Sequence, residues 1–487
     1  MELDYTICES ARLSRDPRFD GRFFTAVTST GIYCRPVCPA PSPKRANVRY
    51  YPTAAAAAEA GFRPCLRCRP EAAPGTPAWS GTSATVNRGL RLIAEGALDD
   101  GDVETLAARL GVGPRHLHRL FVRHLGASPL AVAQTRRLHF AKKLLDETDL
   151  PMAQVALAAG FGSVRRFNDQ IRKIYARTPS QLRRLHQAAT APRPGQYVFQ
   201  LAYRPPYDWD SLLDFLERRA IPGVEAVVDG RYRRSIALGG RHGVIDVGHA
   251  ASACALTLQI RFPEPTALLR IVARVRRLFD LEADPATIAR HFQNDALLGL
   301  SARHRPGLRI PGAWDGFELA VRAILGQQVT VAAASRRAGV LAHRLGEPLA
   351  LDDDVLDRIF PTPARLASVQ LDGMPAIRAR AIQALGQAIA GGELRLEPDA
   401  APEQMLQRLT AIPGIGDWTA QYIAMRALGE PDALPVADLV LLRAAGDGKP
   451  LEPKQLLAQA EAWRPWRAYA AMHLWGLATE EKCISAT

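Results

Sequence analysis

Leu409-Thr-Ala-Ile-Pro-Gly-Ile-Gly-Asp-Trp-Thr-Ala-Gln-Tyr-Ile423 is the most informative stretch of this 487-residue sequence. It predicts one helix that ends before Pro413 and a second helix that begins after Gly416. A Pro-Gly-x-Gly turn at this place exposes backbone N–H groups beside the positive end of the second helix dipole. Such a turn binds a DNA phosphate without reading base sequence. The turn alone is equally compatible with a plain connection between two helices, so its surroundings decide.

The surroundings of this hairpin resemble the AlkA-type DNA-3-methyladenine glycosylases across residues 196–478. The resemblance implies a small β-rich domain at 196–300, which contains an alternating β-type pattern, and an all-α helix-hairpin-helix glycosylase domain at 301–480. The motifs that carry it, besides the hairpin, are Pro205-Pro-Tyr-Asp-Trp209, Arg322-Ala-Ile-Leu-Gly-Gln-Gln328, Leu434-Pro-Val-Ala-Asp438 and Trp463-Arg-Pro-Trp-Arg-Ala-Tyr-Ala-Ala-Met-His-Leu-Trp475.

The resemblance also implies roles for individual residues. Asp438 matches the catalytic carboxylate, which stabilises the oxocarbenium character of the sugar and helps to position water. An alkylated base is turned out of the helix and carries positive charge, so an electron-rich aromatic pocket attracts it. The expected pocket residues are Trp418, Tyr422, Trp475 and Phe215, with core packing as the alternative for any single tryptophan. The expected phosphate-binding residues are Gly414 and Gly416.

Two positions refine this expectation. Lyase-type relatives carry a Schiff-base lysine two residues after the second hairpin glycine, where this chain has Trp418. Only Cys483 lies where such relatives often hold an iron-sulfur cluster. We therefore expect a monofunctional glycosylase, a hydrolase of N-glycosyl bonds. Gln328 stands at the position of the family's apolar wedge, which fills the gap left by the flipped base, and an amide can still occupy that gap.

Four of the seven cysteines lie close together near the N-terminus. Cys34 and Cys38 form a C-x3-C pair, and Cys65 and Cys68 form a C-x2-C pair. Two close pairs of soft thiolates suit a tetrahedral zinc site, so we expect one zinc ion per chain. The spacing alone favours a closed structural zinc knuckle, because most four-cysteine sites are structural.

Residues 1–75 resemble the N-terminal zinc domain of the Ada alkylation-response proteins. In that family one zinc-bound thiolate takes the methyl group of a DNA methyl phosphotriester, and Cys34 matches that position. The implied acceptor is consumed in a single turnover, and the loss of one negative charge favours tighter DNA binding. Arg67 is an expected DNA contact, although Pro39-Ala-Pro41 replaces family positions that are often basic. The matching motifs are Asp20-Gly-Arg-Phe-Phe24, Thr30-Gly-Ile-Tyr-Cys-Arg-Pro36 and Ala60-Gly-Phe-Arg-Pro-Cys-Leu-Arg-Cys-Arg-Pro70.

Residues 84–186 contain two successive helix-turn-helix patterns. Each has an apolar helix, a glycine turn and a basic helix, and each ends in a Ser/Thr-Pro stop, at Ala127-Ser-Pro129 and Arg177-Thr-Pro179. The alternative is a plain helical bundle with a charged face. The pair resembles the AraC-type DNA-binding domain, which implies contacts to base edges and phosphates from its second helices. The implied contact residues are Arg115, His116, His118 and Arg119, then Ser163, Arg165, Arg166 and Asn168.

The charge balance agrees with a nucleic-acid partner. Of the net charge of +13, Lys and Arg exceed Asp and Glu by four in residues 1–71, by eight in 84–186 and by one in 187–487. A basic face attracts a polyanion, although a solvated arginine-rich surface is the bland alternative. We find neither a signal peptide nor an apolar run that spans a membrane. We therefore expect a cytoplasmic, nucleoid-associated protein with thiols kept reduced.

These observations predict a multi-domain, mainly α protein for DNA alkylation repair and response. Its partners would be double-stranded DNA with alkylated bases and methyl phosphotriesters, promoter DNA and RNA polymerase. Stretches at 72–83 and 187–196 are expected linkers. One alternative is an alkylation-responsive transcription activator whose glycosylase domain is inactive, and another is a zinc-sensing regulator. No Pro-Cys-His-Arg motif occurs, so we expect no guanine O6-methyltransferase domain.

Overall fold

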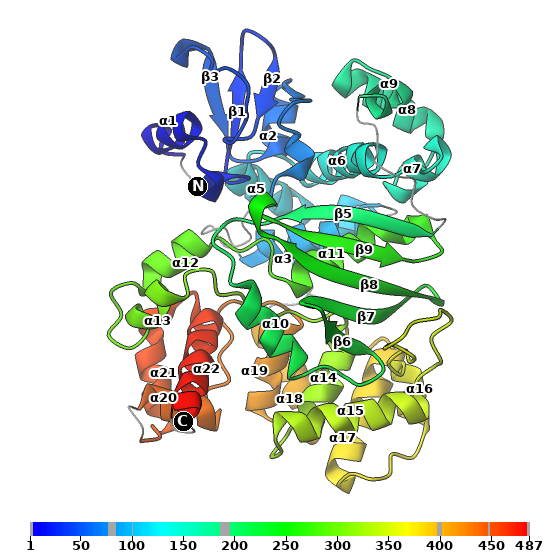
Figure 1. The fold of residues 1–487 in the computed structure, drawn as a ribbon, viewed down its shortest axis with the longest axis vertical. Coiled ribbons are helices and arrows are strands. Elements are labelled where there is room, and N and C mark those ends of the chain that lie inside the picture. Colours follow the sequence, from blue (N-terminus) through cyan, green and yellow to red (C-terminus); the bar gives the residue numbers. More distant parts are fainter. Residues whose placement is uncertain are drawn as a thin grey trace. The chain divides into compact units, whose positions relative to one another are not determined.

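The computed structural model describes residues 3–75, 84–99, 101–185, 195–396, 402–446 and 449–484. These residues form two compact units (Figure 1). Unit 1 comprises 1–205, 238–276 and 281–284, and unit 2 comprises 206–237, 277–280 and 285–487. Most of both expected linkers lies outside the described residues. The fold is mainly α-helical with two small sheets, as predicted, while the four domain boundaries stay a prediction.

The first 75 residues of unit 1 form a four-stranded sheet with the order β3-β1-β2-β4. β1 pairs antiparallel with β2 and β3, whereas β2 and β4 are parallel. Thr53 caps an alanine-rich helix, whose small side chains pack against Phe24 and Tyr33 of the sheet. The elements are α1 (Tyr5–Ser14), β1 (Phe24–Val27), β2 (Ile32–Cys34), β3 (Val48–Tyr51), α2 (Ala54–Glu59) and β4 (Arg63–Pro64), with short 3-10 turns at Pro17–Phe19, Arg45–Asn47 and Pro70–Ala72.

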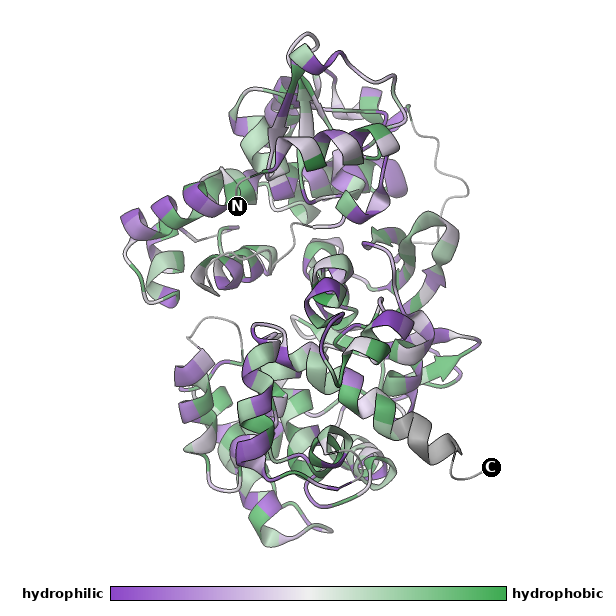
Figure 2. Cartoon of the chain, turned by 90° about the vertical axis from the view of Figure 1, so that its left-hand side faces the viewer, coloured by the Kyte–Doolittle hydropathy of each residue, from purple (hydrophilic) through white to green (hydrophobic). Residues whose placement is uncertain are grey.

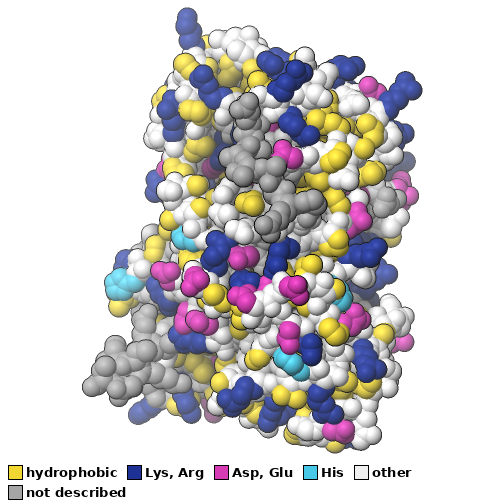
Figure 3. All heavy atoms as spheres, turned by 45° about the vertical axis from the view of Figure 1, so that its right-hand side comes forward, with side chains coloured by type: hydrophobic (Ala, Val, Ile, Leu, Met, Phe, Trp, Pro, Cys, Tyr) yellow, Lys and Arg dark blue, Asp and Glu magenta, His cyan; other side chains and the backbone are white. Residues whose placement is uncertain are grey.

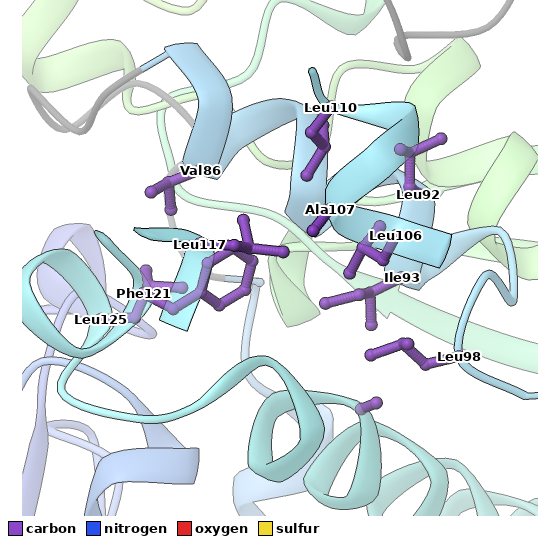
Figure 4. Packing of buried hydrophobic residues seen from close by; sticks show 11 residues of the cluster. Val86, Leu92, Ile93, Leu98, Leu106, Ala107, Leu110, Leu117, Phe121 and Leu125 are labelled. Carbon is purple, nitrogen blue, oxygen red and sulfur yellow. The ribbon is translucent and has the colours of Figure 1, made fainter. Parts of the chain in front are cut away.

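The next part of unit 1 consists of two helix-turn-helix motifs joined by the long helix α6. Leu106, Leu117 and Phe121 are fully or almost fully buried in the core of the first motif (Figure 4). Ser128 and Ser163 cap the helices that follow them, because each hydroxyl accepts a hydrogen bond from a first-turn N–H. The elements are α3 (Ala84–Ala94), α4 (Val103–Arg109), α5 (Pro114–Leu125), α6 (Pro129–Glu147), α7 (Met152–Ala158), α8 (Val164–Tyr175) and α9 (Pro179–Arg183).

Helix α6 is also where the cysteine domain joins the helix-turn-helix pair inside unit 1. The fully buried Lys142 donates to Asp146 over 2.6 Å and lies 3.6 Å from Glu71. Arg69 forms an ion pair of 2.9 Å with the same Asp146. A buried charge is tolerated only when it is paired, so these four residues fix the cysteine domain against α6.

Three strands of the second sheet, β7, β8 and β9, fall in the segment where the pattern at 230–260 predicts strands, whereas β5 and β6 precede it. In unit 1, β9 pairs antiparallel with both β5 and β8. In unit 2, β6 and β7 form an antiparallel pair. The strands are β5 (Gln196–Ala202), β6 (Glu225–Val228), β7 (Arg231–Leu238), β8 (Arg241–Ala250) and β9 (Ala255–Arg261), and α11 (Leu268–Leu278) follows after short 3-10 turns at Ala251–Ala253 and Pro265–Ala267.

The remainder of unit 2 is helical, and Figure 2 shows hydrophobic and hydrophilic residues alternating along its helices, the pattern that lets each bury one face. A buried ion network ties α14 to the β6–β7 pair, because Arg234 contacts Glu318 at 2.7 Å and Glu225 at 3.1 Å. Among the described residues, no helix is long and apolar enough to cross a membrane. The helices are α10 (Trp209–Glu217), α12 (Pro285–Phe292), α13 (Gly299–His304), α14 (Gly316–Leu325), α15 (Val331–Leu345), α16 (Pro363–Ser368), α17 (Ala376–Ala390), α18 (Pro402–Thr410), α19 (Asp417–Arg426), α20 (Leu439–Ala445), α21 (Pro453–Gln459) and α22 (Arg467–Ile484), with a 3-10 turn at Ala460–Trp463.

Candidate functional site

The four N-terminal cysteines converge on one point of unit 1. Cys34 ends β2 and Cys38 follows in the next loop, while Cys65 and Cys68 lie in the turn after β4. Their Sγ atoms all lie within 4.8 Å of one another. The edge of a tetrahedron of thiolates bound about 2.3 Å from a zinc ion is about 3.8 Å, so a small inward movement completes the site. The four residues therefore fit one zinc ion, as the sequence predicts.

Backbone hydrogen bonds and one arginine hold the two cysteine pairs together. The N–H of Cys65 donates to the carbonyl oxygen of Tyr33 over 3.0 Å, which joins the two loops. Arg35 donates its backbone N–H to Cys68 Sγ over 3.4 Å, and its side chain forms an ion pair with Asp20. Cys65 and Cys68 are buried, whereas Cys34 and Cys38 are partly exposed. By residue exposure, the first pair is thus the more accessible one.

The predicted hairpin lies between α18 and α19 in unit 2. Gly414 has φ +92°, a left-handed conformation that favours glycine, and a Cβ there would lie 2.9 Å from the Cβ of Ala381. Gly416 is the N-cap of α19, and no side chain caps the first-turn N–H groups of this helix. This is the geometry for binding a phosphate. Asp417 is exposed in the same first turn and opposes an anion there.

A second turn, at residues 326–329, packs against this hairpin. Gln327 donates from Nε2 to the carbonyl oxygen of Gly414 over 2.9 Å and to Thr419 Oγ1 over 3.1 Å. Arg378 donates to the carbonyl oxygen of Gln327. The next residue, Gln328, is exposed and has φ +54°, a strained conformation for any residue other than glycine. The sequence singled out Gln328 but missed Gln327 and Arg378, whose roles depend on contacts between distant segments.

Asp438 lines a cleft of about 680 Å³ in unit 2. It is the N-cap of α20, where its Oδ1 accepts the N–H groups of Val440 and Leu441. Trp418 Nε1 donates to Oδ2 over 3.0 Å, and Trp475 Nε1 donates to Oδ1 over 3.3 Å. Four donors from three separate segments therefore hold this carboxylate in one orientation, and the same contacts orient both indole rings.

Three of the four predicted aromatic residues form one group beside Asp438. Trp418 and Tyr422 stack with ring centroids 5.4 Å apart and an interplanar angle of 8°. Tyr422 and Trp475 make an edge contact with centroids 6.3 Å apart. All three line the cleft together with Asp438. The structure thus brings together residues that are up to 57 positions apart in the sequence.

Phe215 also lines the cleft, and two arginines lie against its ring, one of which also lies 5.5 Å from the ring centroid of Tyr422. The guanidinium carbon of Arg219 lies 3.7 Å from the ring centroid of Phe215, and that of Arg426 lies 4.9 Å away. Arg426 also donates to the hydroxyl of Tyr422 over 2.7 Å. Burial raises the pKa of Tyr422, but Arg426 and Arg219 outweigh burial and lower it. Sequence reasoning missed this arginine wall, because any arginine of a helix suits a solvated surface equally well.

The predicted DNA contacts of the helix-turn-helix pair lie mostly on exposed faces in unit 1. On α5, Arg115, His116, His118 and Arg119 are exposed, and the apolar Leu117 between them is buried. On α8, Arg165 and Arg166 are exposed, and Asn168 is partly exposed. The hydroxyl of Ser163 accepts the N–H of Arg166 as the N-cap of α8. Arg67, between two of the cysteines, is exposed as well.

Family models match three parts of the chain. The metal binding domain of Ada matches residues 7–71, a helix-turn-helix domain matches 106–185, and the AlkA N-terminal domain matches 198–315. Among solved structures, a 3-methyladenine DNA-glycosylase from Archaeoglobus fulgidus superposes with a TM-score of 0.52 at 21% identity. It covers 58% of this chain and 98% of the archaeal chain, and the likeness establishes the fold of this region.

Two curated relatives extend the likeness to sequence. DNA-3-methyladenine glycosylase 2 of Escherichia coli is 39% identical over 285 residues, which are 57% of this chain and 96% of that protein. A probable bifunctional transcriptional activator/DNA repair enzyme AlkA of Mycobacterium tuberculosis is 42% identical over 484 residues, 98% of this chain and 97% of the relative. The chain therefore belongs to the family of bifunctional transcriptional activator/DNA repair proteins in which an Ada-type metal-binding domain and a helix-turn-helix domain precede an AlkA-type glycosylase fold.

Proposed function

We propose that the chain removes alkylated bases of the 3-methyladenine type from double-stranded DNA as a monofunctional N-glycosylase, with Asp438 as its catalytic carboxylate. We also propose that Cys34 accepts a methyl group from DNA methyl phosphotriesters in a single turnover. The observation that carries the glycosylase proposal is the placement of Asp438, which four hydrogen bonds orient in the wall of an aromatic cleft.

The cleft suits a flipped, positively charged base. The π faces of Trp418 and Trp475 attract a cation, and the carboxylate of Asp438 lies beside them, while Tyr422 stacks on Trp418 and supports it. Departure of the base leaves positive charge on the sugar, which a preoriented carboxylate stabilises without reorganisation. Water then adds to the sugar carbon that has lost the base. Since residue 418 is tryptophan, no lysine stands there to form a Schiff base, and the DNA strand stays intact.

The arginine wall of the cleft separates its two sides. Arg219 and Arg426 lie against Phe215, so this ring already interacts with cations of the protein itself. A cationic base is repelled from that side and attracted to the side of Trp418, Trp475 and Asp438. Electrostatics therefore place the base next to the carboxylate, and Phe215 acts as a support for the two guanidinium groups.

The methyl-transfer proposal rests on the four-cysteine site and on the Ada-type domain match. A bound zinc ion would keep all four sulfurs deprotonated at neutral pH. The Cys34 sulfur then attacks the methyl carbon of the triester, an S–C bond forms, and the C–O bond breaks with its electron pair on the phosphate oxygen. The products are a thioether and an ordinary phosphodiester, so one chain repairs one site. Partial exposure of Cys34 supports its access to DNA.

The helix-turn-helix pair would couple methylation of Cys34 to promoter binding. Exposed basic residues on α5 and α8 suit the major groove of promoter DNA, and methylation of Cys34 would lower the negative charge near the DNA. We propose that the methylated chain then binds its promoter and recruits RNA polymerase at the nucleoid.

One experiment tests both activities and the rival interpretations. Purified chain is incubated with DNA that carries radiolabelled methyl groups on bases and phosphates, and both released base and label on protein are measured. We expect free 3-methyladenine without strand breaks, and one label per chain at most. Label on the protein without released base would favour an activator with an inactive glycosylase domain. If neither product forms and the DNA affinity changes only when zinc is removed, a zinc-sensing regulator would be favoured.

A further inference from the structure

A second hollow in unit 2 carries an unusual concentration of positive charge. It measures about 470 Å³ and lies between α15 and the segment 370–374. Arg336, Arg337 and Arg344 of α15 line it, and the single carboxylate in its wall is Asp372. In the lower part of the molecule, at the level at which α15 and α17 lie in Figure 1, the face drawn in Figure 3 carries several Lys and Arg side chains.

The three guanidinium groups are not neutralised by carboxylates of the described residues. None of them forms an ion pair with a described residue, and Asp372 instead accepts a hydrogen bond from Gln370 Nε2 over 3.1 Å. Arg336 and Arg344 are exposed. The Nη1 atom of Arg337 is buried and has no hydrogen-bond partner among the described residues. Because an unsatisfied buried donor is costly, the hollow is suited to an anion from outside the chain.

Helix α15 separates this hollow from the base cleft. Val331, Ala334, Ser335 and Ala338 line the cleft, at the spacing of one helix face. The residues of α15 that line the hollow begin at Ala333, two positions after Val331, and include Arg336, Arg337 and Arg344. Two residues correspond to about 200° around an α-helix, so the two rows lie on opposite sides.

The turn at residues 326–329, which carries the expected wedge residue Gln328, lies directly before α15. Gln328 lies two residues before Thr330, the N-cap of α15. The segment 370–374 leads into α17, from which Arg378 binds the carbonyl oxygen of Gln327. A nucleotide that is turned into the cleft brings its own strand to the cleft side of Gln328. The paired strand then lies on the opposite side of Gln328, the side of the hollow.

We propose that Arg336, Arg337 and Arg344 bind backbone phosphates of the DNA strand paired with the damaged strand, an inference that rests on the proposed base excision by unit 2. A guanidinium fork binds a phosphate through two parallel hydrogen bonds, and the hollow accepts the phosphate groups. This contact reads no base. It holds the undamaged strand in place while the damaged nucleotide leaves the stack.

The test uses the full zinc-loaded chain and a duplex with one stable abasic-site analogue. The variant Arg336→Gln/Arg344→Gln removes two exposed charges and leaves Arg337 unchanged. The matched control Arg290→Gln/Arg303→Gln removes two exposed charges from α12 and α13. Removing one phosphate-binding charge lowers the magnitude of the slope of log affinity against log salt by about 0.9. We therefore expect the slope of the double variant to be smaller by about 1.8, and its DNA binding to be weaker by roughly tenfold or more at physiological salt. The control should keep the wild-type slope.

A second arm identifies the strand. Methylphosphonate linkages remove the phosphate charges of one strand at a time near the abasic analogue. With the paired strand neutralised, wild type and variant should bind equally, whereas neutralising the damaged strand should leave their difference intact. An unchanged salt slope, or a difference that survives on the neutralised paired strand, would overturn the inference. Release of methyladenine by wild type is measured separately, so failure of excision with an intact strand effect would reject the proposed function alone.

Discussion

At the scale of single residues, the most constrained side chain of the proposed active site is Asp438. Its two oxygens accept hydrogen bonds from two backbone N–H groups and two indoles. The carboxylate therefore has a structural duty, capping α20, as well as its proposed catalytic one. A useful substitution must separate these two duties.

Asp438→Asn makes that separation. Asparagine keeps Oδ1 for the helix cap and places an NH2 group opposite the indole N–H of Trp418, so the fold survives and only the hydrogen bond from Trp418 disappears. We expect the excision rate to fall on the order of 100-fold or more, because the anion that faces the sugar cation is gone. DNA binding should persist or tighten slightly. Single-turnover release of methyladenine and a binding titration measure the two effects.

The control for this variant is Asp417→Asn, which removes an exposed carboxylate beside the hairpin. It should strengthen DNA binding and leave the saturated excision rate unchanged. Near wild-type excision by Asp438→Asn would mean that another group supplies the carboxylate.

Cys34 is the second residue with a specific prediction. After reaction with methyl phosphotriester DNA, peptide mapping should place the methyl group on Cys34, and Cys34→Ser should accept none. Cys38 is the informative comparison, since it is the other partly exposed cysteine of the site. Label on Cys38 would refute the assignment. Zinc content measured on the wild-type chain should be one ion per molecule.

At the scale of elements, the hairpin before α19 depends on two glycines for different reasons. Gly414 has a left-handed backbone and packs against α17, where Ala381 leaves no room for a side chain. Gly416 has an ordinary φ of −87°, and a Cβ there would meet nothing within 4 Å. The two positions therefore form a matched pair for mutation.

Gly414→Ala should destabilise unit 2 by roughly 2 kcal/mol or more, since it adds backbone strain to a steric overlap. Gly416→Ala should lower the free energy of unfolding by less than about 1 kcal/mol, the effect of a poorer helix N-cap. Urea unfolding measures both values. Equal losses would show that the packing of the hairpin on α17 is unimportant for stability.

A buried ion pair secures α6 in unit 1. Asp146→Asn would leave the fully buried Lys142 with Glu71 at 3.6 Å as its nearest remaining carboxylate among these partners. We expect a loss of about 3 kcal/mol or more in the free energy of unfolding of unit 1. The exposed pair of Glu461 and Arg464 provides the comparison, and Glu461→Gln should leave the free energy of unfolding almost unchanged, because solvent screens this pair. Calorimetry of the zinc-loaded chain would detect the difference, and similar small losses in both variants would contradict it.

At the scale of the whole molecule, a buried histidine makes the stability of unit 2 depend on pH. In unit 2, His473 of α22 is buried, and its Nδ1 lies 2.9 Å from Ser301 Oγ. Burial and, to a lesser extent, the charge of Arg305 together lower its pKa to about 4, against the opposing effect of Asp208. The folded unit therefore keeps this imidazole neutral.

The predicted pH dependence follows from that shift. Above pH 6.5 His473 is neutral in both states, so its contribution is complete. As the pH falls from 6.5 towards 4, the unfolded chain binds a proton that the folded unit does not, and up to about 3 kcal/mol of stability is lost. His473→Gln should weaken this dependence for unit 2. A stability profile of the variant that still falls as steeply as that of wild type would assign the effect elsewhere.

Sequence alone determined the chemistry-bearing residue types and their local setting. Cysteine pairs of fixed spacing, two glycine turns between amphipathic helices and a Pro-Gly-x-Gly turn are local patterns, because neighbouring residues and backbone geometry suffice to specify them. These patterns predicted the zinc site, the helix-turn-helix pair and the hairpin, and the fold confirms their local structure.

Only the tertiary structure decided which distant side chains meet. The contacts of Asp438 with Trp418 and Trp475, of Gln327 with Gly414, and of two arginines with Phe215 join segments that no periodicity connects. The arginines of α15 likewise resemble any solvated helix face until the fold places them around a hollow with a single carboxylate. The physical reason is that these contacts depend on how whole helices pack, and packing is set by the combined burial of many side chains and not by any local pattern.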